Sequence, residues 1–194
     1  EWIERDRRSA GYVVHSELNI GGNADTNCFS KNSIVHNLVR ECGAGHGIYV
    51  WNAGSGGNTR YITNNVIYNL EDSSDDAYGI RVVASNYPVE ILNNTVYYVQ
   101  TVSDTSSGFF IEDSDAILKN NVAARATGSP SDCFSGSAFS SSTHDYNLST
   151  DSTATGTTSV TREAYDDLFV STAAGTADLH PNDGANAEGL GLDC

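Results

Sequence analysis

The sequence predicts an all-β protein that folds as a parallel β-helix, a solenoid of about six or seven coils. Three observations support this fold class. Two short motifs recur in alternation, with copies 27 to 32 residues apart. Apolar and polar residues alternate within them, which is the period of a strand and not of a helix. β-branched and aromatic residues, which favour strands, dominate both motifs.

The first repeat is marked by a pair of asparagines inside an apolar stretch. Its three copies are YITNNVIYN (61–69), EILNNTVYY (90–98) and ILKNNVAAR (117–125). Asn adopts left-handed backbone geometry more readily than most residues, so each pair predicts a tight corner between two strands. One Asn of each pair should turn inward and join a hydrogen-bonded ladder along the solenoid. The inward residues are expected to be Asn65, Asn94 and Asn121.

The second repeat begins with a glycine at the start of a strand. Its copies are GIYVW (47–51), GIRVV (79–83) and GFFIE (108–112), with a weaker copy starting at Gly136. Each unit is therefore expected to hold two short strands joined by polar corners. Alternation predicts three inward columns of stacked core residues. These columns are Ile48, Ile80 and Phe109; Val50, Val82 and Ile111; and Ile62, Ile91 and Leu118.

The chain of 194 residues is long enough for one domain with one core. We expect residues 1–194 to form a single β-helix domain in three parts. Residues 1–27 are expected to be an N-terminal cap or an incomplete coil, and residues 28–160 the coils. Residues 161–194 are expected to be a non-repeating arm laid against the solenoid.

The charge balance excludes some classes of partner. The chain has 10 basic and 25 acidic residues and a net charge of −15. So few cations cannot neutralise a row of phosphates, so no nucleic-acid partner is expected. No apolar run approaches the roughly 20 residues that cross a bilayer, so no membrane span is expected.

The cysteines and two short triplets predict secretion to the extracellular space or the cell surface. The four cysteines, an even number, fit an oxidising compartment, although a cytosolic protein with four free thiols is the alternative. Asn93-Asn94-Thr95 and Asn147-Leu148-Ser149 match the glycosylation sequon, which makes Asn93 and Asn147 candidate glycosylation sites.

Four cysteines allow three disulfide pairings. We favour Cys28–Cys42, which would cross a coil near the N-terminal end. Cys133–Cys194 would then attach the C-terminal arm to the solenoid.

The motifs I-x-N-N-x-[IV] and G-I-x-V resemble the right-handed parallel β-helix repeats of the pectate-lyase-like superfamily. The resemblance covers roughly residues 29–190, and the tail at 165–189 resembles the closing segment of many secreted proteins of that group. It implies a right-handed solenoid. It leaves function open, because the superfamily includes lyases, hydrolases, epimerases, phage spikes and non-catalytic surface proteins.

The outward positions of the second repeat form the candidate glycan-binding surface. Lyases of the superfamily place a Lys or Arg base and calcium-held carboxylates on the outer face of one sheet. Here alternation places Arg81 outward between two aromatic residues, an arrangement that suits a sugar chain with acidic groups. The alternative is an exposed wall whose aromatic rings pack on the C-terminal arm or on a neighbouring molecule. The candidate residues are Tyr49, Trp51, Arg81, Phe110 and Glu112.

Candidate catalytic residues are few: Arg81, Glu112 and His46. The segment 45–47, Gly-His-Gly, resembles a motif of the polygalacturonases. In that family paired aspartates precede the histidine and an Arg-x-Lys follows it. Here the paired aspartates at 75–76 come after the histidine, and Arg81 is followed by two valines, so the motif fails by order. No pair of carboxyl groups can be assigned to the two sides of a scissile glycosidic bond.

Three aspartates form a candidate calcium site. Asp75, Asp104 and Asp132 each lie four residues before a glycine of the second repeat, counting Gly136 as the third glycine. Stacked coils would bring them to one corner, where a calcium ion shared by two or three carboxylates would fit. The alternative is a solvated acidic edge, since neighbouring carboxylates repel by only about 0.8 kcal/mol in water.

These features predict a non-catalytic module that binds glycans or builds an extracellular surface structure. The alternative is a secreted polysaccharide lyase or glycoside hydrolase acting on an acidic polysaccharide, which the scarcity of Lys and the failed hydrolase motif disfavour. The basic opening, with Arg5, Arg7 and Arg8, and the acidic tail from Asp166 onward predict head-to-tail self-association that can extend into a filament. A monomer with both ends solvated is the alternative.

Overall fold

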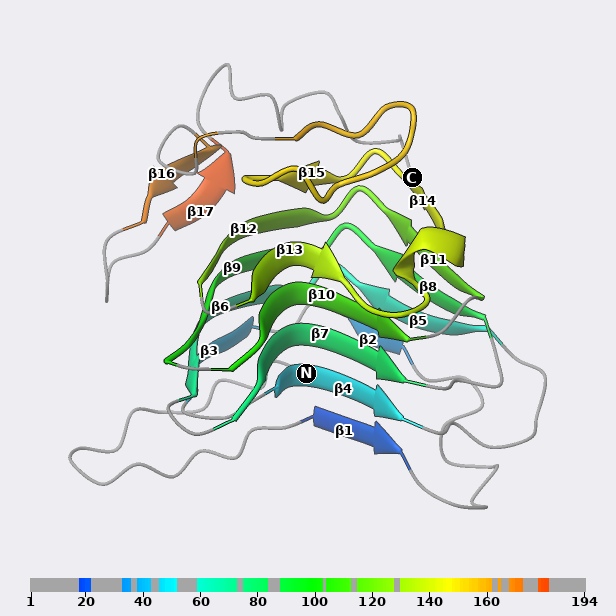
Figure 1. Ribbon diagram of the computed structural model, residues 1–194, viewed down its shortest axis with the longest axis horizontal. Helices are drawn as coiled ribbons and strands as arrows, with labels where there is room; N and C mark the ends of the chain where they lie inside the picture. Colours follow the sequence, from blue (N-terminus) through cyan, green and yellow to red (C-terminus); the bar gives the residue numbers. More distant parts are fainter. Residues whose placement is uncertain are drawn as a thin grey trace.

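The computed structural model describes residues 18–21, 33–35, 38–42, 46–51, 59–72, 75–83, 88–102, 104–112, 115–127, 130–161, 164, 168–172 and 178–181 (Figure 1). β-Strands are the main secondary structure of these residues, and three parallel sheets stack along a common axis. The arrangement is compatible with the predicted β-helix. Each of the three sheets has five strands in the described ranges. The right-handed sense and the number of six or seven coils stay predictions.

Each sheet takes every third strand of the chain. Sheet A contains β1 (Leu18–Gly21), β4 (His46–Trp51), β7 (Ala77–Val83), β10 (Ser106–Glu112) and β13 (Ser131–Ser135). Sheet B contains β2 (Ser33–Val35), β5 (Arg60–Thr63), β8 (Val89–Leu92), β11 (Ala116–Lys119) and β14 (Thr143–Asp145). Sheet C contains β3 (Leu38–Cys42), β6 (Val66–Asp72), β9 (Thr95–Thr101), β12 (Val122–Thr127) and β15 (Leu148–Ser149).

A coil therefore holds three strands, and the expectation of two strands per unit was wrong. The doubled asparagines explain the difference, because they divide the first repeat into one strand of sheet B and one strand of sheet C. Thr63 ends β5 and Val66 begins β6 on either side of the first pair. The same division separates β8 from β9 and β11 from β12.

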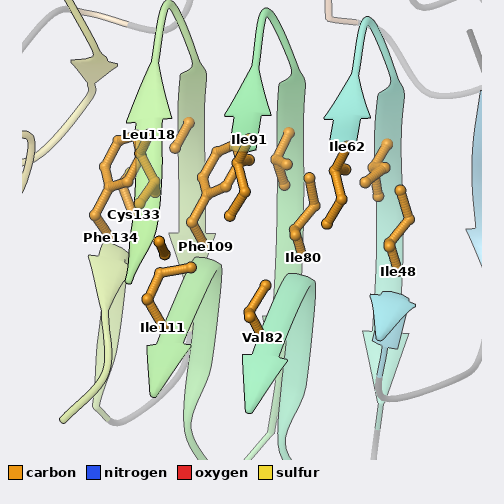
Figure 2. Close-up of a cluster of buried hydrophobic side chains, with 14 of the residues drawn as sticks. Ile48, Ile62, Ile80, Val82, Ile91, Phe109, Ile111, Leu118, Cys133 and Phe134 are labelled. Atoms are coloured by element: carbon orange, nitrogen blue, oxygen red, sulfur yellow. The ribbon is translucent and has the colours of Figure 1, made fainter. Parts of the chain in front are cut away.

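The core lies between the three sheets and is built from the predicted columns (Figure 2). Ile48, Ile80 and Phe109 occupy matching positions on β4, β7 and β10 and are fully buried. The other two predicted columns are buried in the same cluster. Burying a side chain of this size contributes about 1.5–3 kcal/mol, so the columns are the main source of stability along the axis.

The two asparagines of each pair have different structural roles, as predicted. The first Asn of each pair has a left-handed backbone, with φ between 56° and 57° at Asn64, Asn93 and Asn120. The second turns inward and is fully buried, which confirms the expectation for Asn65, Asn94 and Asn121. Each inward Asn hydrogen-bonds to its equivalent one coil further on. The Nδ2 groups of Asn65, Asn94 and Asn121 donate to the next Oδ1 at 2.8, 3.0 and 3.0 Å, the last acceptor being Asn147.

Tyr146 occupies the corner position that Asn holds in the preceding coils. Its φ is +54°, a conformation that costs a residue with a large side chain roughly 1 kcal/mol and Asn less. We expect Tyr146→Asn to raise the free energy of unfolding by about 1 kcal/mol, measured by urea denaturation. The reverse change in the preceding coil, Asn120→Tyr, is the control and should destabilise by a similar amount. A loss of stability in Tyr146→Asn would show that packing of the ring outweighs backbone strain.

The segment after β15 covers the last strands of sheets A and C. The Asp151 Oδ2 accepts a hydrogen bond from the Cys133 N–H at 2.6 Å, and the Thr153 Oγ1 accepts one from the Phe134 N–H at 2.9 Å. Val160 forms a parallel bridge with Leu148 of β15. Two backbone donors of β13 are thus satisfied by side chains of the same protein, which is one way to protect a sheet edge.

This covering changes how the predicted head-to-tail contact must be understood. A second copy that paired with the edge of β13 or β15 would have to displace the contacts that Asp151, Thr153 and Val160 make there. Self-association stays a prediction, and at this end it would depend on surface complementarity and not on simple strand addition.

Two smaller elements complete the described part of the chain. The short 3₁₀ helix η1 (Phe139–Ser141) follows β13, and the Phe139 ring stacks on that of Phe134 with centroids 5.8 Å apart. The strands β16 (Phe169–Ser171) and β17 (Asp178–Pro181) form an antiparallel pair outside the parallel sheets. Phe169 packs edge-on against Tyr97 of sheet C at 5.7 Å between centroids, so this residue lies against the outer face of that sheet. The non-repeating arm over residues 161–194 stays a prediction.

Candidate functional site

The outer face of sheet A carries the candidate site. Tyr49, Arg81 and Phe110 lie side by side on β4, β7 and β10, in the register expected from the sequence. Neighbouring strands are about 4.8 Å apart, so three successive coils place a cation between two aromatic side chains. The intervening residues of each strand, such as Ile80, point into the core.

A local break in the strand alternation adds two side chains to this face. A Cβ atom built on Gly79 would meet the Val96 side chain in the core, and the next residue, Ile80, is also in the core. Two successive positions therefore face inward, and Tyr78 lies on the same outer side as Arg81. His46 is the equivalent residue on β4. We call His46, Tyr49, Tyr78, Arg81, Phe110 and Glu112 the Arg81 cluster.

The Arg81 guanidinium is the centre of the cluster. It lies 5.2, 5.0 and 5.4 Å from the ring centroids of Tyr49, Tyr78 and Phe110, within the range of cation–π attraction. Its Nη2 donates to the Glu112 Oε2 at 3.4 Å. Its Nε is buried and has no hydrogen-bond partner. The guanidinium is thus held mainly by ring faces, with a single long ion pair.

His46 binds the other side of the guanidinium. Its Nε2 lies 3.1 Å from the Arg81 Nη1. The imidazole also stacks on the Tyr49 ring at 4.9 Å and lies 5.3 Å from the Tyr78 ring. All three candidate catalytic residues, Arg81, Glu112 and His46, are therefore brought together, although His46 was selected from a motif that failed by order.

Tyr78 is the member of the cluster that sequence reasoning missed. Its hydroxyl donates to the Asp76 Oδ2 at 2.9 Å, and its ring lies 4.4 Å from that of Phe110. Burial, followed by the hydrogen bond to Asp76, raises the pKa of the Tyr78 phenol above its ordinary value. Tyr78 therefore stays protonated. Its ring forms one side of the aromatic surroundings of Arg81, and its hydroxyl is a hydrogen-bond donor. Tyr78 could have been identified in the sequence from its position directly before the repeat glycine Gly79, which His46 shares in the preceding copy.

Among the described strands of sheet A, the residues of the cluster come from β4, β7 and β10. On β13 the positions beside Ser107 and Phe110 are Asp132 and Ser135, which carry neither a ring nor a cation. On β1 the position beside Tyr49 is Asn19. Trp51 lies on β4 beside Val83, but its side chain is outside the described part of the structure. Its predicted role in glycan binding stays a prediction.

The three candidate calcium ligands do not form one column. The register of β10 with β13 pairs Ser107 with Asp132, so Cys133 and not Gly136 occupies the position of Gly108. Gly136 instead has a φ of +120° and serves a turn after the strand. A calcium ion held by Asp75, Asp104 and Asp132 together is not compatible with this register, and calcium at the first two stays a prediction.

Other interactions account for the acidic groups in this region. The Asp76 Oδ1 accepts a hydrogen bond from the Thr105 N–H at 2.9 Å, and the Asp75 Oδ1 accepts one from the Asp76 N–H at 2.9 Å. Burial, followed by the charge of Asp151, raises the pKa of the Asp132 carboxyl. Within the described ranges, no group of three or more His, Cys, Asp or Glu side chains is placed to hold a metal ion.

The two predicted glycosylation sites differ in the fold. Asn147 is fully buried, and its Nδ2 donates to the Leu118 carbonyl at 2.9 Å as the last asparagine of the ladder. A glycan on that nitrogen is incompatible with this arrangement, so the expectation for Asn147 conflicts with the fold. Asn93 lies at a corner and is partly exposed. Glycosylation at Asn93 stays a prediction.

The cysteines are described only in part. Cys133 has a free, buried thiol whose Sγ lies 3.4 Å from the Thr150 Oγ1, and burial raises the pKa of that thiol to about 11. Its expected partner Cys194 lies outside the described residues, as do Cys28 and the side chain of Cys42. The predicted Cys133–Cys194 bond has no support from the structure, and the Cys28–Cys42 bond stays a prediction.

Comparison with known proteins adds no relative. No protein-family model, curated protein or solved structure matches the chain. The resemblance to the pectate-lyase-like superfamily therefore rests on the repeats, and the three parallel sheets rest on the structure. No helix in the described ranges is long and apolar enough to cross a membrane.

Proposed function

We propose that this protein is an extracellular, non-catalytic module that binds glycans through the Arg81 cluster. The observation that carries the proposal is the Arg81 guanidinium set among three aromatic rings on the outer face of a rigid sheet. Rings of Tyr49 and Phe110 offer apolar faces to the C–H groups of a sugar, and the guanidinium offers donors to its oxygens. The ligands that fit best are sugars carrying carboxylate or sulfate groups.

An acidic ligand can replace the internal partner of Arg81. The Arg81 and Glu112 side chains are 25% and 29% exposed, and their single contact is 3.4 Å long. Ion pairs of this kind contribute about 0–1 kcal/mol, so exchange of Glu112 for another anion costs little. A ligand carboxylate at Nη2 would take the place of this single long contact and make a charge-assisted hydrogen bond of its own.

Arg81→Gln tests the proposal by removing the charge while keeping a polar side chain. We expect the affinity for a galacturonic acid tetrasaccharide, measured by isothermal titration calorimetry, to fall at least tenfold, or about 1.4 kcal/mol. A neutral galactose tetrasaccharide should bind more weakly to the wild type and respond less to the substitution. Binding of the acidic ligand should also weaken as salt is added.

Lys119→Gln is the matched control. It removes the same charge from β11 in sheet B, away from the Arg81 cluster. Equal weakening in both variants would indicate general charge attraction and not a site. Unchanged affinity in a folded Arg81→Gln protein would exclude the Arg81 cluster as the binding surface.

A polysaccharide lyase or glycoside hydrolase is the second candidate, favoured by one observation. Arg81, His46 and Glu112 form a contiguous set of a cation, an imidazole and a carboxylate. Against it, the guanidinium is engaged by both neighbours, and no second carboxylate has been assigned opposite Glu112 across a scissile bond. The incubations used for binding distinguish the two functions, because cleavage would release unsaturated or reducing ends.

A further inference from the structure

The contact between His46 and Arg81 exists in only one protonation state of the histidine. A guanidinium is always charged and has only donors. The His46 Nε2, 3.1 Å from the Arg81 Nη1, must therefore accept the hydrogen bond. A neutral imidazole with its proton on Nδ1 can accept at Nε2, whereas an imidazolium cannot.

The groups around His46 come from three strands. On its own strand β4, the Tyr49 ring stacks on the imidazole. From β7 come Arg81 and the ring of Tyr78, whose hydroxyl donates to the Asp76 carboxylate. From β10, Glu112 lies on the other side of the guanidinium. On β1, the described residues 18–21 include no titratable side chain. The charged group that contacts the imidazole from β7 is therefore the positive guanidinium of Arg81.

We propose that His46 is a proton-controlled positioning residue that strengthens binding of acidic glycans as the pH falls. This inference rests on the proposed function. When His46 takes up a proton it loses the hydrogen bond to Arg81, and the Nη1 donors of the guanidinium become available to a ligand. The cluster then presents two positive charges and one carboxylate. A bound glycan carboxylate stabilises the imidazolium, so the complex holds more protons than the free protein and affinity rises on acidification.

The size of the effect follows from one added charge. A unit charge about 6 Å from a bound carboxylate contributes roughly 0.7 kcal/mol in water and roughly 3 kcal/mol at an effective dielectric constant of about 20, so a gain of roughly fivefold in affinity lies near the lower end of this range. The sugar carboxylates stay ionised between about pH 8 and about pH 5, so the ligand does not add its own pH dependence over that range.

The experiment is calorimetric titration with the galacturonic acid tetrasaccharide across that pH range. We expect the wild type to bind roughly fivefold more tightly at the acidic end. His46→Gln should bind with nearly constant affinity, because the Gln oxygen can still accept from Arg81 but takes up no proton. His144→Gln is the control. His144 lies on β14, where it stacks on Phe139 and bonds to the Thr155 hydroxyl, and its loss should leave the pH dependence intact. Thermal melting checks that each variant is folded.

The outcomes separate this inference from the proposed function. Binding with the same pH dependence in wild type and His46→Gln overturns the role of His46 and keeps the binding site. Absence of binding at every pH overturns the proposed function. In that case an NMR titration of the His46 ring decides the positioning role. Arg81→Gln should raise the pH at which His46 titrates, because it removes a cation 3.1 Å away, and an unchanged titration overturns the inference.

Discussion

Replacing Asn94 with alanine is expected to lower the free energy of unfolding by about 4 kcal/mol, the largest effect of any single substitution proposed for this protein. Asn94 is fully buried at the middle of the asparagine ladder. Its Oδ1 accepts from the Asn65 N–H at 3.0 Å and from the Asn65 Nδ2 at 2.8 Å. Its Nδ2 donates to the Ile62 carbonyl at 2.8 Å and to the Asn121 Oδ1 at 3.0 Å.

The cost is large because the partners of Asn94 remain buried after the side chain is gone. Alanine removes the acceptor of two Asn65 donors and one donor to the Ile62 carbonyl, all in the interior. Each unsatisfied buried group costs about 1–3 kcal/mol. Aspartate would not restore the ladder, since a carboxylate cannot donate to the Ile62 carbonyl or to the Asn121 Oδ1 and would add a buried charge.

Urea denaturation measures the effect, with Asn93→Gly as the matched control. Asn93 precedes Asn94 at the same corner and has a φ of +57°, which glycine adopts readily. We expect the control to change stability by less than about 1 kcal/mol. If Asn94→Ala costs no more than Asn93→Gly, the ladder contributes little and the apolar columns alone hold the coils together.

Gly79→Ala is expected to destabilise the protein by about 3 kcal/mol, although alanine normally stabilises a strand relative to glycine. A Cβ atom at Gly79 would lie 2.3 Å from the Val96 Cγ1 and 2.6 Å from the Gly108 carbonyl oxygen. Both distances are far below contact distance. The gain from a less flexible unfolded chain is about 0.4–1 kcal/mol, too little to offset this overlap.

The double variant Gly79→Ala/Val96→Ala separates the two contacts. Shortening Val96 removes the side-chain overlap but not the contact with the Gly108 carbonyl, which belongs to the neighbouring strand. We expect the double variant to be destabilised by less than the sum of the two single effects. A double-mutant cycle of unfolding free energies from calorimetry measures this difference. Strict additivity would mean that Gly79 and Val96 do not meet in the fold.

Gly79 also links the core to the candidate site. Because positions 79 and 80 both face inward, the strand reverses its alternation there, and this reversal places Tyr78 beside Arg81. A shift of β7 away from Val96 would move both side chains. Gly79→Ala is therefore expected to weaken glycan binding as well as stability, whereas Asn94→Ala acts on the corner between sheets B and C.

Pattern in the amino-acid sequence was enough to predict the stacked strands and the composition of the core. Alternation within short repeats assigns Ile48, Ile80 and Phe109 to the interior and Tyr49, Arg81 and Phe110 to the outer face, because successive residues of a strand point to opposite sides. The doubled asparagines also marked the corners correctly, since few other residues adopt left-handed backbone geometry at low cost.

Features that depend on register and on exceptions to alternation became visible in the folded chain and not in the sequence. The match of Gly108 with Cys133, and not with Gly136, follows from hydrogen bonding between β10 and β13, which a count of residues between glycines cannot show. His46 and Arg81 are 35 positions apart in the sequence and meet because the strand alternation is broken. The close packing of Gly79 against Val96 permits this break. Local pattern sets which face a residue prefers, but the contacts that make a site arise between coils, where small shifts in register change every partner.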